Sequence, residues 1–190
     1  MRSGSRTGYR LTYDDFVQFP DDGLRHEIID GEHYVTPSPN RRHQRLLRRL
    51  LFALESYLRL HPGVGEIFVA PFDVVLSHWD IVEPDLLLIA NDQQEILTPL
   101  HVKGAPALVV EILSPSTRKR DQRLKRELFE RQGVREYWMV DPEANRVSIH
   151  RRLSEGSFPC VATPSAADRD VLTTPILPGF GLALDELFVE

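Results

Sequence analysis

The chain has 190 residues, of which 42% are hydrophobic and 27% charged, as is usual for a soluble globular protein. Its 23 basic and 28 acidic residues give a net charge of −5, which argues against a protein that coats polyanions with its whole surface. The single cysteine, Cys160, excludes an internal disulfide partner and a cysteine-based zinc site. Because no apolar stretch is long enough to span a bilayer and the first seven residues lack the apolar core of a signal peptide, we expect a cytoplasmic protein without a membrane partner.

The length predicts a single domain over residues 10–190, preceded by a flexible N-terminus over residues 1–9. Thr12 begins a short helix that extends through residue 19 and ends before Pro20. Residues 25–30 and 32–36 then form a β-hairpin around Gly31.

Residues 41–60 form a long helix with two distinct faces. One face carries Leu47, Leu50, Leu51, Leu54 and Leu58, and the opposite face carries Arg41, Arg45, Arg48 and Arg49. His43 projects with the leucines, either as a hydrogen-bonded core residue or as a ligand. The arginines are either a solvated face or a contact for phosphates.

Short strands are expected over residues 65–70 and 73–76, and a further strand over residues 82–90 after a loop at residues 78–80. Asp85 follows Pro84 at the start of the last apolar run, where it either caps a turn or belongs to a polar site. Residues 91–104 form a polar connection with some helical character.

The central part of the chain is typical of a strand, a helix and a second, parallel strand. Residues 107–113 form an apolar run broken by Glu111, residues 114–117 supply turn and N-cap chemistry, and Gly133 ends the helix before a strand over residues 136–140. On the helix, the side facing the sheet carries Asp121, Leu124, Lys125 and Leu128. Glu111 and Lys125 therefore form either a structural ion pair or part of a catalytic site.

The C-terminal part is expected to contain an edge strand over residues 146–153, a pairing segment over residues 158–163 and a short helix over residues 184–188. Val147 and Val161 are expected on exposed apolar edges that would support a homodimer.

The recurring polar residues indicate a possible metal site. Carboxylates that converge, here Asp85, Glu111 and Asp121, must either take up a proton or bind a cation, and Mg²⁺ prefers such oxygen ligands. A nearby Lys125 ammonium would stabilise charge on a phosphoryl group or orient an attacking water. Glu27 is either a further acid of this site or a surface residue of an edge strand.

In this order, Pro84-Asp85, the Glu111 strand, LSPST, an Asp-x-x-x-Lys helix and GVREYWMVD resemble the Uma-type restriction endonuclease family of the PD-(D/E)xK superfamily. HEIIDGE, the start of the helix at His43 and PGFGLALDELF extend the resemblance over most of the chain. The resemblance implies an α/β (mixed α+β) fold of the restriction-endonuclease type. In this fold, helices flank a central mixed β-sheet, and an N-terminal β-hairpin forms an extension.

The resemblance also implies hydrolysis of DNA phosphodiester bonds with Mg²⁺, for which Mn²⁺ would substitute. Its metal ligands would be Asp85, Glu111 and the backbone carbonyl of Ile112, with Glu27 nearby. The sequence departs from the superfamily at Leu113, where a lysine is expected, and Lys125 is the residue we expect to replace it.

Arg118, Lys119 and Arg120 are candidates for contacts with the nucleic-acid backbone. Two further functions remain open: a catalytically silent nucleic-acid-binding or assembly domain, and a metal-dependent hydrolase acting on another phosphate or on a nucleotide.

Overall fold

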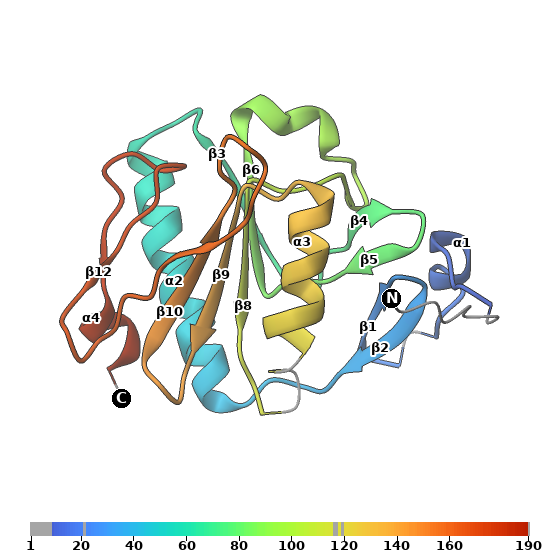
Figure 1. The fold of residues 1–190 in the computed structure, drawn as a ribbon, viewed down its shortest axis with the longest axis horizontal. Helices are drawn as coiled ribbons and strands as arrows, with labels where there is room; N and C mark the ends of the chain where they lie inside the picture. Colours follow the sequence, from blue (N-terminus) through green and yellow to red (C-terminus); the bar gives the residue numbers. More distant parts are fainter. Residues whose placement is uncertain (1–8, 21, 116–117, 119, 190) are drawn as a thin grey trace.

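The computed structural model describes residues 9–20, 22–115, 118 and 120–189. They form two main β-sheets with helices on both faces of the larger one (Figure 1). The long helix α2 (Arg41–Leu60) lies on one face of that sheet, and α3 (Arg126–Gln132) lies on the other. This mixed α/β architecture confirms the fold class expected from the sequence.

The larger sheet has six strands, and only its two central strands, β8 and β9, are parallel to each other. Turn η2 (Arg120–Lys125), which is π-helical, and α3 connect these two strands, which confirms the expected strand, helix and strand unit. The strands lie in the order β11 (Cys160–Ala162), β10 (Arg146–Arg151), β9 (Glu136–Asp141), β8 (Leu108–Ile112), β6 (Leu86–Ala90) and β3 (Gly65–Val69).

The smaller sheet has five strands and includes the N-terminal hairpin. Asp30 and Gly31 form its turn with φ values of 54° and 77°, the left-handed backbone that a tight hairpin of this kind requires. The strands lie in the order β2 (Glu32–Thr36), β1 (Arg25–Ile29), β5 (Asp80–Val82), β4 (Val74–Ser77) and β7 (Val102–Lys103).

The remaining elements are short. A capping box formed by Thr12 and Asp15 begins α1, and Gly133 ends α3 with a φ of 92°, as the sequence predicts. Among the described residues, no helix is long and apolar enough to cross a membrane. These elements are α1 (Tyr13–Phe16), the 3₁₀ turn η1 (Asn91–Ile96), β12 (Val171–Leu172), β13 (Leu182–Ala183) and α4 (Leu184–Phe188).

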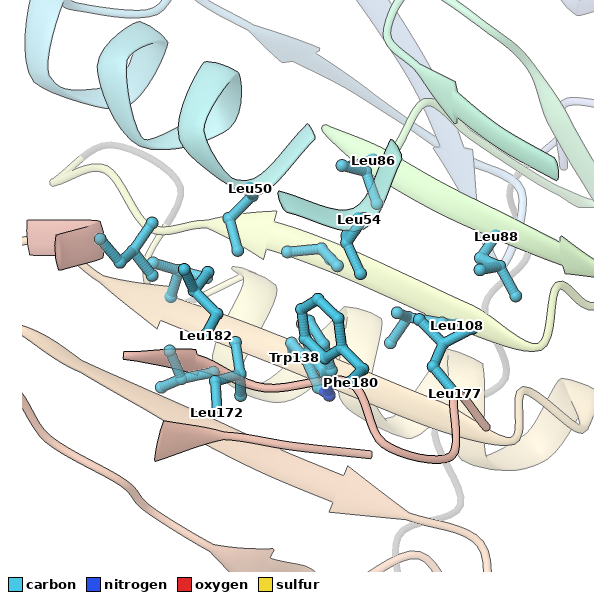
Figure 2. Close-up of a cluster of buried hydrophobic side chains, with 14 of the residues drawn as sticks. Leu50, Leu54, Leu86, Leu88, Leu108, Trp138, Leu172, Leu177, Phe180 and Leu182 are labelled. Carbon is cyan, nitrogen blue, oxygen red and sulfur yellow. The ribbon is translucent and has the colours of Figure 1, made fainter. Parts of the chain in front are cut away.

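Helix α2 begins where the Asn40 side chain accepts a hydrogen bond from the His43 backbone N–H, at 3.0 Å. Its buried face is rotated slightly from the expected leucine stripe, since Leu47, Leu51 and Leu58 are only partly buried. The buried positions follow the spacing of helical turns and are His43, Leu46, Leu50, Leu54 and Tyr57. Figure 2 shows Leu50 and Leu54 of α2 in one cluster with Leu86, Leu108 and Trp138 of the sheet, and the C-terminal residues Leu172, Leu177, Phe180 and Leu182 close the same core.

Side chains alternate along β8, so the strand serves two different environments. Leu108, Val110 and Ile112 belong to the core beneath α2, whereas Val109 belongs to the core beneath α3. Glu111 shares the side of Val109, and this places its carboxylate beneath the connection between β8 and β9.

Three expectations were wrong in detail. The first helix ends at Phe16 rather than residue 19. The strand expected over residues 82–90 is broken at Glu83, Pro84 and Asp85, because proline cannot donate a ladder hydrogen bond, and its two halves belong to different sheets. Val147 is fully buried, because β10 is an internal strand and this side chain belongs to the core that Leu172 and Leu177 close, whereas Val161 is 39% exposed.

Candidate active site

A cavity of about 210 Å³ lies where the end of β8 meets the hairpin, the start of α2 and turn η2. Several residues that the sequence singled out share it: His43, Asp85, Glu111, Ile112, Arg120 and Lys125. The other lining residues are Arg25, Thr36, Pro37, Ser38, Pro39, Asn40, Ser114 and Pro115. The structure therefore brings together groups from five separate segments of the chain.

Asp85 lies at the strand break before β6, and both of its carboxylate oxygens accept hydrogen bonds. Oδ1 accepts from the Arg25 guanidinium at 2.8 Å, and Oδ2 lies 2.9 Å from Nε2 of His43. The backbone N–H of Ile112 also donates to Oδ2, at 2.8 Å. These contacts fix the orientation of a side chain that is 2% exposed.

The same contacts set the ionisation of Asp85. Burial by itself raises the pKa of a carboxyl group, but the hydrogen bond and charge of His43, the charge of Arg25 and the N–H of Ile112 outweigh it. Together they lower the pKa of Asp85 to about 2. Asp85 is therefore a carboxylate at neutral pH.

Lys125 points into a nest of acids beside the cavity. Its Nζ lies 2.5 Å from Oε1 of Glu111, 2.7 Å from Oε1 of Glu27 and 3.9 Å from Oδ1 of Asp121. Burial disfavours an ammonium, but the charges of Glu111, Glu27 and Asp121 outweigh it and raise the pKa of Lys125. The lysine thus remains a charged donor.

Glu111 has the opposite balance, since burial, together with the charges of Asp85, Asp121 and Glu27, raises its pKa although Lys125 opposes the shift. Within the described ranges of the chain, the cluster contains three carboxylates, Glu27, Glu111 and Asp121, and two cations, Lys125 and Arg120. One excess negative charge in a buried site favours binding a proton or a further cation. Glu111 lines the cavity and is the carboxylate that would meet such a cation.

Glu27 and Asp121 support Lys125 from behind rather than lining the cavity. Oε1 of Glu27 also accepts a hydrogen bond from the Glu83 backbone N–H at 3.0 Å. Asp121 and Lys125 are buried at 1% and 2% exposure, which confirms that both face the sheet. Leu124, expected on the same face, is only half-buried.

The three residues proposed for nucleic-acid contact differ from one another. Arg118 donates to Asp141 at 2.7 Å and to Glu143 at 2.8 Å, so acids already surround its charge. Arg120 points inward, where it donates to Oγ1 of Thr36 at 2.7 Å. Lys119 lies outside the described residues, as do Ser116 and Thr117 of the expected turn.

Sequence reasoning missed two residues of the site. Arg25 pairs with Asp85, and its position two residues before Glu27 on one strand was a usable signal, because such positions share a face. Glu83 is the second, and burial, with the charges of Asp73 and Glu27, raises its pKa to about 7. It borders a neighbouring cavity of about 350 Å³ that also contacts Arg25, His43 and Asp85.

The donor set of the cavity fits a hard cation in its chemistry. Among the residues that the structure describes, no three His, Cys, Asp or Glu side chains are grouped as a metal-binding set. Mg²⁺, however, commonly binds proteins through one or two carboxylates and completes its coordination with water and substrate phosphate. Asp85 and Glu111, which line the same cavity, are such a pair.

Comparisons with known proteins identify a family and a similar fold. The model of the Uma2 family, described as "Putative restriction endonuclease", matches residues 13–185. The fold is similar to the crystal structure of a putative nuclease belonging to DUF820 from Anabaena variabilis ATCC 29413, with a TM-score of 0.75 and 18% sequence identity. That match covers 94% of this chain and 97% of the other. Among curated proteins, none matches the chain in sequence.

Proposed function

Because the chain belongs to the Uma2 family, whose description is that of a nuclease, we propose that it hydrolyses phosphodiester bonds of DNA at the cavity beside Glu111. One observation carries the proposal: the buried Lys125–Glu111 pair, 2.5 Å between Nζ and Oε1, shares a cavity with the ionised Asp85. Two acids can hold a metal ion that polarises the phosphate, and a lysine beside them can stabilise the negative charge that develops during phosphodiester hydrolysis.

In this proposal Lys125 supplies positive charge to the phosphoryl group. Its raised pKa keeps it an ammonium, so it donates hydrogen bonds and does not act as a base. It reaches the site from η2, whereas the superfamily position for this lysine, Leu113, carries no polar group. Lys125 is thus the proposed replacement for the missing strand lysine.

Asp85 and Glu111 are the proposed acidic pair, with the carbonyl of Ile112 as a further oxygen donor. His43 and Arg25 orient Asp85 through the hydrogen bonds to its two oxygens. Mg²⁺, or Mn²⁺ in its place, would supply Lewis-acid neutralisation of the charge that develops on the phosphate. Arg120, held by Thr36, keeps a second positive charge at the cavity wall.

Nicking of supercoiled plasmid tests the proposal, with Mg²⁺ or Mn²⁺ at low salt. The wild type is expected to nick, and Glu111→Gln is expected to lose at least about a hundredfold in rate, as when a central electrostatic group of an active site is removed. Addition of EDTA is expected to stop the wild-type reaction.

Glu136→Gln provides a matched control, because Glu136 is also a fully buried glutamate in an ion pair, with Arg151 at 2.5 Å, but does not line the cavity. It is expected to keep its nicking rate per folded molecule. If wild type and Glu111→Gln both leave the plasmid intact but shift it on a gel, the protein is a silent nucleic-acid-binding domain and the nuclease proposal fails.

A further inference from the structure

Helix α2 concentrates positive charge that the proposed chemistry does not use. It contains six arginines and one acid, Glu55, and so carries a charge of +5 in a chain whose net charge is −5. The rest of the chain therefore carries −10. A solvated face needs no such segregation of charge, whereas a surface that binds an anion benefits from it.

The arginines gather at the unfavourable end of the helix. The N-terminus of a helix carries partial positive charge, and acidic residues are the ones that stabilise it. In α2 the first turn has no acid, and Arg41, Arg42 and Arg45 occupy the first two turns instead. Both the helix and its side chains consequently present positive charge at this one end.

These side chains line a groove of about 300 Å³ between α2 and the C-terminal segment. Four arginines, Arg41, Arg42, Arg45 and Arg49, line it together with Leu46, Phe188 and Val189. In the part of the chain that the structure describes, no ion pair involves Arg41, Arg45 or Arg49. Among the described residues, the Arg49 guanidinium donates to the neutral backbone carbonyls of Leu187 and Val189.

The arginine groove adjoins the cavity of the candidate active site. Asn40 and His43, which flank Arg41 and Arg42 in the sequence, line that cavity. From Arg41 to Arg49 the helix rises by about 12 Å, which corresponds to roughly three successive phosphates of one duplex strand. A DNA backbone lying along the groove would therefore lead toward Asp85 and Glu111.

We infer that the arginine groove on α2 binds the phosphate backbone of duplex DNA and directs it to the cavity. The choice of DNA rests on the proposed nuclease function, whereas the groove, its charge and its position do not. Contacts of this kind fix the position of the duplex and carry no base specificity.

Binding of a fluorescent duplex of about 30 base pairs, measured by anisotropy in EDTA so that no cleavage occurs, tests the inference. The logarithm of the association constant falls linearly with the logarithm of the salt concentration, and each phosphate contact adds about 0.9 to the magnitude of this slope. For Arg41→Gln/Arg45→Gln we expect the magnitude of this slope to fall by about 1.8 and the affinity at about 0.1 M salt to fall at least roughly tenfold.

The control, Arg59→Gln/Arg123→Gln, removes the same charge from two exposed arginines outside the groove. It is expected to leave the slope within about 0.3 of the wild type. Equal slopes for the two double variants, or no duplex binding by the wild type, would overturn the inference.

The binding result is independent of the nuclease proposal. If Arg41→Gln/Arg45→Gln lowers the salt dependence of duplex binding and the wild type never nicks DNA, the groove assignment stands and the nuclease proposal fails. If the wild type nicks DNA and Arg41→Gln/Arg45→Gln leaves the salt dependence of binding unchanged, the nuclease proposal stands and the groove assignment fails.

Discussion

The two faces of strand β8 differ in polarity: one contributes to an apolar core and the other to a cluster of buried charges. On one side, Val110 and Ile112 belong to the same apolar core as Leu50 and Leu54 of α2. On the other side, Glu111 meets Lys125 in a cluster of buried charges. Adjacent residues of the same strand thus belong to environments of very different polarity.

The two faces are expected to differ in how much they stabilise the fold. Burial of apolar side chains stabilises a fold, whereas a buried ion pair rarely adds more than its desolvation costs. Replacing such a cluster by well-packed apolar residues is often neutral or stabilising, so stability alone does not explain Glu27, Glu111, Asp121 and Lys125. Under the proposed function, the charged face serves the reaction and the apolar face serves folding.

Lys125→Met is expected to have the largest effect on stability. Removal of the ammonium leaves Glu27 and Glu111 buried without their shared cation, which costs about 3–5 kcal/mol of the free energy of unfolding. Chemical denaturation would measure this loss. Lys103→Met, at an exposed position of β7, is expected to change the free energy by less than about 0.5 kcal/mol.

Adding Glu27→Gln to Lys125→Met tests whether the loss of stability in Lys125→Met comes from uncompensated carboxylates. In Glu27→Gln/Lys125→Met one of the uncompensated acids is gone, so we expect at least about 1 kcal/mol to be recovered relative to Lys125→Met. Additive effects of the two substitutions would show that lost packing, rather than charge, explains the loss.

On the apolar face, Leu54→Ala should cost about 2–5 kcal/mol, because Leu54 is fully buried and its truncation leaves a cavity. Its nicking rate per folded molecule should not change, in contrast to substitutions on the charged face. Leu60→Ala, on the same helix at 79% exposure, serves as the control and should have almost no effect on stability. A large loss of nicking in folded Leu54→Ala would contradict the assignment of the two faces.

The free energy of unfolding is also expected to depend on pH. The pKa of Asp85 is lowered from 3.8 to about 2 in the folded protein, so the unfolded chain binds more protons between these values. The free energy of unfolding therefore falls as the pH falls through this window, by about 2 kcal/mol for this group.

Asp85→Asn removes that contribution. Relative to the wild type, its free energy of unfolding is expected to be lower at pH 5, with the difference shrinking by about 2 kcal/mol as the pH falls to 2. Urea denaturation at several pH values measures it. A constant difference over this range would mean that Arg25 and His43 do not stabilise the carboxylate.

Local patterns in the sequence predicted much of the fold. The bounds of α2 and α4 agree with the structure, because helical periodicity and capping residues act within a few positions. The break at Pro84 was missed because the apolar run on both sides resembles one strand, and only the tertiary structure assigns its halves to different sheets. Val147 was misplaced for a similar reason, since Leu172 and Leu177, which share its core, are distant from it in the sequence.

For the site, the sequence predicted that Asp121 and Lys125 face the sheet, because their spacing alone requires it. It did not predict that Arg25 pairs with Asp85 or that Arg120 turns inward to Thr36, since these contacts join segments 60 and 84 residues apart. Long-range pairing of charges depends on the arrangement of the sheets and leaves no local pattern.

The most direct test of the account is to measure plasmid nicking and Mn²⁺ binding together in Lys125→Met, with Glu27→Gln/Lys125→Met as the variant of better expected stability. The nicking rate of each variant is expressed per folded molecule. The account predicts that nicking is lost in both variants, while the Lys125→Met protein still binds Mn²⁺ through Asp85 and Glu111 with an affinity within about threefold of the wild type. Nicking at the wild-type rate in folded Lys125→Met would contradict the assignment of Lys125 as the catalytic lysine.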